Sequence, residues 1–296
     1  MISDRDVVIY QEQGYILVED VLDKAQLDAA RHVIDGILAS AKGRATHDDM
    51  FDFEASHTPD NPRVRRIKKP HVVNRLFWEL AQSPRMLSVV TKLIGANVRL
   101  HGSKLNIKAP RYGSPVEWHQ DWAFYPHTND DILAIGVMLD DVLDENGPML
   151  VLPGSHKGPT FDHHGEGRFC GAMNPAAVPL DFKKAVSVTG KAGSCSFHHV
   201  RLVHGSAQNT SDRPRQLLLY ECAAADAWPL VNWSDLEEFD SRMLCGEKTL
   251  HPRLAAAPVR MPYPPALNQG SIYENQTAVG SRYFEISSAT NQVLLT

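Results

Sequence analysis

The run Glu117-Trp118-His119-Gln120-Asp121-Trp122 and the distant His204 give the first indication of how this chain is built. If the segment around His119 is a strand, its two-residue side-chain period places His119 and Asp121 on the same face. An imidazole nitrogen and a carboxylate oxygen on one face can share a metal ion, for which His204 is the candidate third ligand. Two His and one carboxylate on one face of an octahedron leave three positions open, which is typical of non-haem Fe(II) oxygenases.

The His-x-Asp pattern alone is a weak signal. The chain contains 14 His, so about one such match is expected by chance. A second match begins at His47, and His164 begins a His-x-Glu. His47 lies in a polar run, whereas His119 follows a strand-like segment and lies between two Trp. On the pattern alone, the alternative is an ordinary strand His next to a solvated Asp.

The composition is that of an ordinary globular protein. The chain has 296 residues, of which 43% are hydrophobic and 22% are charged, and we favour one domain over residues 1–296. The net charge of −5 and the sequence pI near 6.3 give no general attraction to nucleic acid or to an anionic membrane. The four Cys show no Cys-x-x-Cys spacing, so we expect neither a zinc knuckle nor a disulfide framework.

Targeting signals are not recognisable in the sequence. No apolar run approaches the length of a membrane-spanning helix, and residues 1–6 lack the apolar core of a signal peptide. We therefore expect a cytoplasmic protein that has neither a membrane nor a nucleic-acid partner.

Helical patterns dominate residues 1–95, with a short strand at 15–18. Ser3 followed by Asp6 is a helix start signal, and Gly14 is a stop signal. Residues 43–62 are polar and contain two Pro, so we expect a loop there. The expected helices are 4–13, 24–41, 75–82 and 84–94.

A basic cluster follows the expected loop. Two interpretations are open: these cations hold an anionic substrate such as a phosphate or carboxylate, or they form a solvated face with acidic neighbours. The cluster consists of Arg63, Arg65, Arg66, Lys68 and Lys69.

From residue 98 onward, the pattern changes to short apolar or β-branched segments separated by turn residues. Such segments indicate an antiparallel sandwich or barrel, with the preceding helices as a layer on one face. Residues 160–173 have no clear period and form either a lid over a site or a surface insertion. A helix at 234–244 and a Pro-rich tail follow, and neither suggests a catalytic role. The expected strands are 98–107, 132–139, 149–152, 186–188, 195–203 and 216–222.

Arg215 is the candidate anchor for an anion. Alternation in its strand places Arg215, Leu217 and Leu219 on one face, where a buried guanidinium is costly unless an anion meets it. Fe(II) with one Asp and two neutral His carries one positive charge. Addition of a 2-oxoglutarate dianion changes the net charge of the site to −1, and one Arg makes it neutral. Arg213 is the rival, but it lies in an expected turn and should face water.

At these residues the sequence resembles the phytanoyl-CoA dioxygenase family of Fe(II)/2-oxoglutarate oxygenases. The resemblance implies a mainly β fold with flanking helices: a double-stranded β-helix, the jelly roll of the cupin type, at about 98–222. A helical segment, residues 1–95, precedes this core, and a helix with the Pro-rich tail, 223–296, follows it. The resemblance rests on Leu105-Asn106, Trp118-His119-Gln120-Asp121, Asn146-Gly147-Pro148, Pro153-Gly154-Ser155-His156, His204-Gly205-Ser206 and Arg215.

By this resemblance, His119, Asp121 and His204 match the iron ligands. Arg215 matches the 2-oxoglutarate-binding Arg, with Ser206 as a helper. The implied activity is oxidation, by preference hydroxylation, of a C–H bond in a small organic substrate. It consumes dioxygen and 2-oxoglutarate and releases succinate and CO2. Hydroxylation is favoured over halogenation because related halogenases replace the carboxylate that is present here as Asp121.

The resemblance also bears on other positions of the predicted core. Family members often carry a polar or aromatic residue where this chain has Ile135-Gly136-Val137, so we expect no cofactor contact there. Lys104 and Asn106 share one strand face, and they either contact 2-oxoglutarate or substrate or are strand-edge polar residues. The expected substrate wall, which could equally be core, consists of Trp122, Phe124, Tyr125, Phe161, His163 and Phe169.

Two other classes of function stay open. One is a cupin-like module that binds a metal or small molecule without oxygenase activity. The other is a Zn(II) hydrolase that activates water. Neither class has a use for a buried Arg215.

Overall fold

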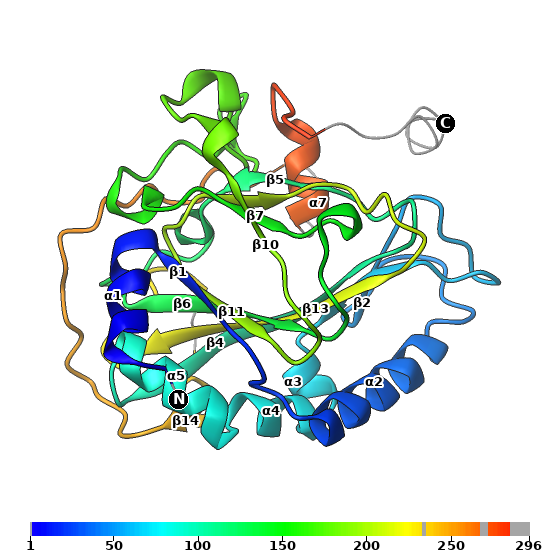
Figure 1. Cartoon of the computed structure of the whole chain (residues 1–296). Coiled ribbons are helices and arrows are strands. Elements are labelled where there is room, and N and C mark those ends of the chain that lie inside the picture. Colours follow the sequence, from blue (N-terminus) through cyan, green and yellow to red (C-terminus); the bar gives the residue numbers. More distant parts are fainter. Residues whose placement is uncertain (1, 233–234, 267–271, 285–296) are drawn as a thin grey trace.

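The computed structural model describes residues 2–232, 235–266 and 272–284. Over these residues, two facing antiparallel sheets form the centre of the molecule (Figure 1). The larger, eight-stranded sheet has the order β1 (Tyr15–Val18), β11 (Cys195–His199), β6 (Ile132–Met138), β13 (Arg215–Ala224), β4 (Val98–Lys108), β3 (Val64–Lys68), β2 (Phe51–Phe53), with β14 (Met243–Cys245) beside β4. The four-stranded sheet has the order β10 (Val186–Val188), β7 (Met149–Val151), β12 (His204–Ser206), β5 (Val116–His119).

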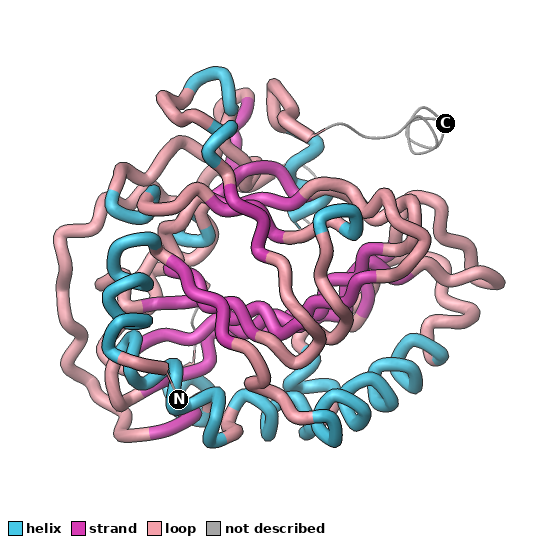
Figure 2. Tube along the Cα trace, viewed as in Figure 1, coloured by secondary structure: helices cyan, strands magenta, loops and turns pink. Residues whose placement is uncertain are grey.

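The path of the chain between the sheets identifies the core. β4, β6, β11 and β13 belong to the larger sheet, while β5, β7, β10 and β12 belong to the smaller one. Consecutive strands therefore cross from sheet to sheet, except between β7 and β10, where the separate hairpin β8 (His164–Gly165) and β9 (Arg168–Phe169) intervenes. This is a double-stranded β-helix, which confirms the predicted fold class. Figure 2 shows the two sheets as separate layers of strands.

The helices of the first third cover the outer face of the larger sheet, as predicted (Figure 1). Ile34, Phe77 and Met86 lie on three different helices and share one buried cluster with Phe197 of the sheet. The Tyr220 hydroxyl donates a hydrogen bond to the Phe77 carbonyl at 2.6 Å, which ties a helix to β13. The helices are α1 (Asp4–Gln13), α2 (Lys24–Ala39), α3 (Pro70–Val73), α4 (Arg75–Ala81) and α5 (Pro84–Ile94).

The start of α1 follows directly from the sequence. The Ser3 side chain accepts a hydrogen bond from the Asp6 amide at 3.3 Å, and the Asp6 carboxylate accepts one from the Ser3 amide at 2.7 Å. Gly14 ends the helix with a φ of 81°, a conformation that favours glycine.

The expected loop at 43–62 and the basic cluster need correction. The loop contains β2, and most of the cluster forms β3, which pairs with β4. Arg65 and Arg66 are buried instead of solvated, and Asp52 meets Lys68 at 2.8 Å. The strand was missed because its charged residues hide the apolar alternation. Buried ion pairs satisfy these charges only in the folded protein.

Some boundaries also differ from those expected. The strand predicted for 195–203 ends at His199, the chain turns, and β12 begins at His204. The helix predicted for 234–244 is α6 (Leu236–Ser241). Residue 234, which was expected to begin this helix, lies outside the described residues, as does the end of the tail, 285–296. In the described portion of the chain, no helix has both the length and the apolar character to cross a membrane.

Candidate active site

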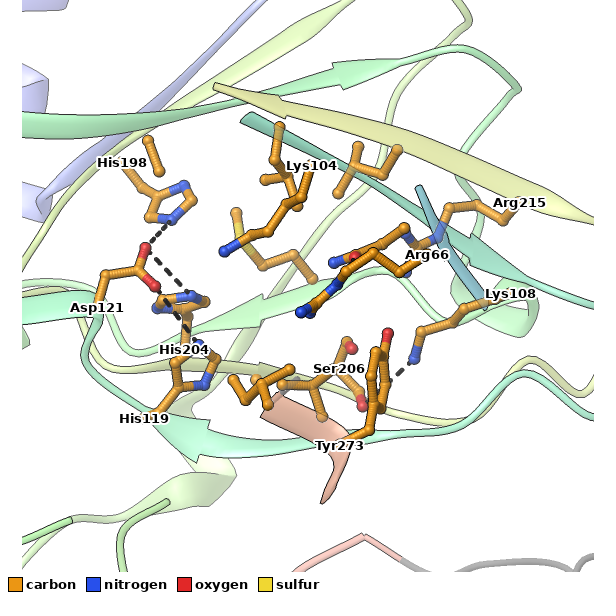
Figure 3. Close-up of a pocket in the computed structure, with 18 residues that line it drawn as sticks. Arg66, Lys104, Lys108, His119, Asp121, His198, His204, Ser206, Arg215 and Tyr273 are labelled. Atoms are coloured by element: carbon orange, nitrogen blue, oxygen red, sulfur yellow. Dashed lines mark hydrogen bonds and ion pairs between the residues drawn. The ribbon is translucent and has the colours of Figure 1, made fainter. Parts of the chain in front are cut away.

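His119, Asp121 and His204 come together where β5 and β12 pair. His119 is the last residue of β5 and lies opposite His204, the first residue of β12. Asp121 does not continue the strand, because a 3-10 turn (Asp121–Ala123) starts there. The two-residue strand period is therefore the wrong reason for its position, although the carboxylate does face the two imidazoles (Figure 3).

Local contacts hold this arrangement. The Gln120 side-chain amide donates hydrogen bonds to the Pro159 and Arg201 carbonyls at 3.1 and 2.8 Å, which fixes the turn after β5. A Cβ added at Gly205 would lie 2.9 Å from the Val116 carbonyl oxygen. Glycine is therefore required next to His204 for β12 to approach β5 this closely.

The three side chains have the geometry of a metal site. The Nε2 atom of His119 lies 3.7 Å from Asp121 Oδ1, and that of His204 lies 3.9 Å from Asp121 Oδ2. One possible ligand atom of each of the three residues lies within 4.8 Å of the other two. Two neighbouring ligand atoms that are each about 2.0–2.2 Å from one ion are about 3 Å apart, so small side-chain rotations would bring these three groups onto a common ion.

The protonation of both imidazoles suits metal binding. His119 Nδ1 lies 2.8 Å from the Glu117 carbonyl, and His204 Nδ1 lies 2.9 Å from the Leu202 carbonyl. A carbonyl only accepts, so each Nδ1 carries the hydrogen and each Nε2 presents its lone pair. Burial lowers the pKa of His204 to about 4 and the pKa of His119 well below its usual value. Two neutral imidazoles and one carboxylate form the donor set that Fe(II) takes in oxygenases.

A deep cavity of about 60 Å³ extends from these residues to Arg215. Arg215 is 3% exposed, and its Nη2 donates a hydrogen bond to the Gly147 carbonyl at 2.6 Å. Lys108 is also buried and donates to the Ala207 carbonyl. In the described portion of the chain, neither cation forms an ion pair with a carboxylate. Burial lowers the pKa of Arg215 to about 10. Two buried cations without an acid form a site for an anion.

Arg213 is placed as predicted, in a turn at the surface. Its side chain is 58% exposed and pairs with Glu145 at 3.1 Å. Arg215, in contrast, lines the deep cavity together with Leu217 and Leu219, as the strand alternation predicted.

A second, outer cavity of about 240 Å³ adjoins the deep one. Arg66, Lys104, Asp121 and Ile272 line both, so the carboxylate of the candidate metal site lies at their junction. Lys104 pairs with Glu221 at 2.8 Å. The remaining residues of the outer cavity are Phe124, Tyr125, Glu221 and Asn275.

The structure separates the other sequence candidates into two groups. Lys104, Asn106 and Ser206 line the deep cavity, and Phe124 and Tyr125 line the outer one. The four other residues expected in the substrate wall line neither cavity, and this corrects the expectation: Trp122, Phe161, His163 and Phe169.

The four have other contacts. The Trp122 indole donates a hydrogen bond to the Pro258 carbonyl at 2.8 Å, and His163 Nε2 accepts one from the Gln120 amide at 2.9 Å. Phe161 packs in a separate cluster around Trp118, and Phe169 packs behind Phe124 with ring centroids 5.1 Å apart. The 3-10 turn after β5 directs Trp122 away from the cavity, which strand alternation could not predict.

Several lining residues were not predicted from the sequence. Lys108 had a usable signal, since it follows Lys104 and Asn106 at two-residue spacing on β4. Tyr273 of α7 (Ile272–Asn275) had none: it comes from the Pro-rich tail, for which we expected no role. Its ring packs against the guanidinium carbon of Arg66 at 5.3 Å. His198 and Glu221 were also missed, whereas Arg66 belongs to the basic cluster for which an anion-binding role was one of the two interpretations.

Comparisons with known proteins agree over most of the chain. The family model described as phytanoyl-CoA dioxygenase (PhyH) matches residues 10–217. A protein named as a probable alpha-ketoglutarate-dependent hypophosphite dioxygenase of Stutzerimonas stutzeri is 37% identical over 93% of this chain and 97% of that protein. The ectoine dioxygenase of Bordetella parapertussis is 29% identical over 72% of this chain and 73% of that protein. The crystal structure of EctD from S. alaskensis with 2-oxoglutarate and 5-hydroxyectoine covers 76% of this chain and 77% of its own, with a TM-score of 0.64 and 26% identity.

Proposed function

The chain belongs to the phytanoyl-CoA dioxygenase (PhyH) family of Fe(II)- and 2-oxoglutarate-dependent dioxygenases, and we propose that His119, Asp121 and His204 hold its iron. The enzyme acts on a small substrate and uses 2-oxoglutarate and dioxygen as co-substrates. Iron in this site supplies oxidation of the substrate, coupled to conversion of 2-oxoglutarate to succinate and CO2. The protein contributes three fixed ligands and a cavity that excludes water.

Arg215 and Lys108 are the proposed partners of the far carboxylate of 2-oxoglutarate. The observation that carries this assignment is that neither buried cation forms an ion pair with a carboxylate of the described residues, and that both lie at the end of the cavity that begins at His119 and His204. A Zn(II) hydrolase or a passive binding module would leave this charge uncompensated. Ser206 lines the same cavity and offers a hydroxyl to the same carboxylate.

We propose that the substrate is a compact anion, on the evidence of the outer cavity. Glu221 already pairs with Lys104, so the charge of Arg66 is the less compensated one. Arg66 Nε donates a hydrogen bond to Asn106 Oδ1 at 3.0 Å, and Asp52 lies 3.9 Å from its Nη1. The cavity volume of about 240 Å³ lies below the range of about 300–1,000 Å³ found for drug-sized ligands.

Hypophosphite, the substrate in the name of the Stutzerimonas stutzeri relative, is the first candidate. In that reaction hypophosphite, dioxygen and 2-oxoglutarate give phosphite, succinate and CO2, and one P–H bond becomes P–OH. A cyclic amino acid such as ectoine is the second candidate, because Glu221 could receive a positive group if it left Lys104. Succinate release measured with hypophosphite and with ectoine, together with phosphorus NMR to detect phosphite, tests which of the two is the substrate. Turnover with ectoine but not with hypophosphite would reverse this order.

Replacing Arg66 tests the anion site. We expect Arg66→Gln to raise the KM for the substrate by about 10- to 100-fold, because a hydrogen bond to a charged group contributes about 1.5–3 kcal/mol. The KM for 2-oxoglutarate should rise less. Initial rates of succinate release, with each compound varied in turn, measure both constants.

Arg63→Gln is the matched control, because Arg63 belongs to the same basic run but is exposed. It should leave both constants unchanged. An equal rise of both KM values in Arg66→Gln would assign Arg66 to 2-oxoglutarate and remove the support for an anionic substrate.

A further inference from the structure

His198 is a third imidazole beside the candidate metal site, and none of the roles above uses it. It lies on β11, where His198 lines the deep cavity and Ser196 lines a small neighbouring cavity, while Phe197 packs into the core on the helix side. His198 is 1% exposed. Its backbone pairs with Ala134 of β6, whose small side chain leaves room for the ring.

The hydrogen bonding of His198 differs from that of the two candidate ligands. His119 and His204 each have a backbone carbonyl at Nδ1, which fixes the hydrogen there. Among the described residues, neither ring nitrogen of His198 has a hydrogen-bond partner within 3.5 Å. Its tautomer is therefore not fixed by the backbone, and Nε2 is able to carry the hydrogen.

The nearest polar atom identifies the acceptor. His198 Nε2 lies 3.6 Å from Asp121 Oδ2, slightly beyond hydrogen-bond length. Figure 3 shows His198 on one side of the Asp121 carboxylate and His119 on the other. The set of possible ligand atoms within 4.8 Å of one another contains His119, Asp121 and His204 but not His198. This position suits a donor to the carboxylate and not a fourth ligand.

We propose that His198 is a positioning residue that donates a hydrogen bond from Nε2 to Oδ2 of the Asp121 carboxylate. A carboxylate that binds a metal through one oxygen is commonly held at the other by such a donor. A shift of less than about 1 Å would bring the two atoms to the length of about 2.8–2.9 Å that a hydrogen bond to an ionised acceptor takes. The inference rests on the proposed iron ligands.

Two other donors near Asp121 define the controls. The Lys104 ammonium is paired with Glu221. The buried Tyr125 hydroxyl interacts with the Asp121 carboxylate, so it is the rival donor to that carboxylate.

The test compares two amides of different reach. His198→Gln places an N–H close to the position of Nε2, whereas the amide of His198→Asn ends near the position of Nδ1 and does not reach Asp121. Anaerobic titration of the metal-free full-length protein with Co(II), followed by its visible absorption, measures the Kd directly. We expect His198→Asn to weaken Co(II) binding by about 10- to 100-fold, the usual effect of losing such a partner, and His198→Gln to stay close to the unaltered protein. Ser196→Ala, on the same face of β11, and Tyr125→Phe should bind Co(II) normally.

The outcomes separate this inference from the proposed function. If the unaltered protein binds no Co(II), the metal site itself is wrong. If the unaltered protein binds Co(II) and His198→Asn binds it equally well, only the role of His198 is wrong. Equal weakening in His198→Asn and His198→Gln would also overturn it, because the ring and not its donor would then matter. Thermal unfolding of each metal-free variant shows whether it is folded. If His198→Asn is not folded, His198→Leu, which fills the space of the ring without a donor, takes its place with the same expected loss.

Discussion

Asp121→Ala should lose Fe(II) binding and 2-oxoglutarate turnover together. Among the described residues, Asp121 is the only carboxylate in the candidate metal-ligand set, which it forms with His119 and His204. Without it, two neutral imidazoles remain to hold a divalent cation. A bound metal stabilises the transition state by several kcal/mol, and each loss of about 1.4 kcal/mol lowers the rate tenfold. Turnover should therefore fall by at least about 10³-fold. Anaerobic Fe(II) titration and succinate release measure the two effects.

The second His-x-Asp pattern of the chain provides the control. Asp49 follows His47 at the same spacing, but its side chain is exposed, and Asp49→Ala should keep full metal binding and turnover. Substantial turnover in Asp121→Ala would refute the ligand assignment.

Arg215→Met should raise the concentration of 2-oxoglutarate required for half-maximal turnover without removing the metal. Breaking a buried ion pair costs about 3–5 kcal/mol, which corresponds to an increase of about 10²- to 10³-fold. Methionine keeps most of the aliphatic stem, so the cavity wall is retained. The same change removes a buried charge that, among the described residues, forms no ion pair with a carboxylate. The melting temperature of the protein without 2-oxoglutarate should therefore rise.

Arg213→Met is the matched control, since Arg213 is two residues away on the same chain segment and faces solvent. It should change neither the 2-oxoglutarate requirement nor the melting temperature by a measurable amount. A larger effect in Arg213→Met than in Arg215→Met would transfer the anchor role to Arg213.

The sequence predicted correctly those parts of the fold in which a short local pattern is compatible with a single structure. Turn residues between short apolar segments predicted the strands, and the alternation around Arg215 predicted the face that lines the cavity. The start of α1 follows from Ser3 and Asp6 alone. His119 was found through the His-x-Asp pattern and its strand-like context, and the family resemblance then supplied His204 as its partner.

The features that it missed depend on contacts between distant segments. β3 carries cationic side chains that are stable in a sheet only because an acid from another segment meets them. Asp52 of β2 pairs with both Arg66 and Lys68. Tyr273 reaches the cavity from a tail that has no periodic pattern. Lys108 shares the strand face of Lys104 and Asn106 and could have been found by the same alternation, whereas no candidate residue on the strand of His198 marked its face as one that lines a site.

The central claim is that one cavity holds Fe(II) at His119, Asp121 and His204 and a 2-oxoglutarate carboxylate at Arg215. Anaerobic titration of metal-free protein with Fe(II) and then 2-oxoglutarate tests it directly, through the visible charge-transfer absorption of the keto acid bound to iron. We predict that the band appears in the unaltered protein, requires far more 2-oxoglutarate in Arg215→Met, and is absent in Asp121→Ala. Folded, iron-loaded protein that shows no band at saturating 2-oxoglutarate would contradict this account.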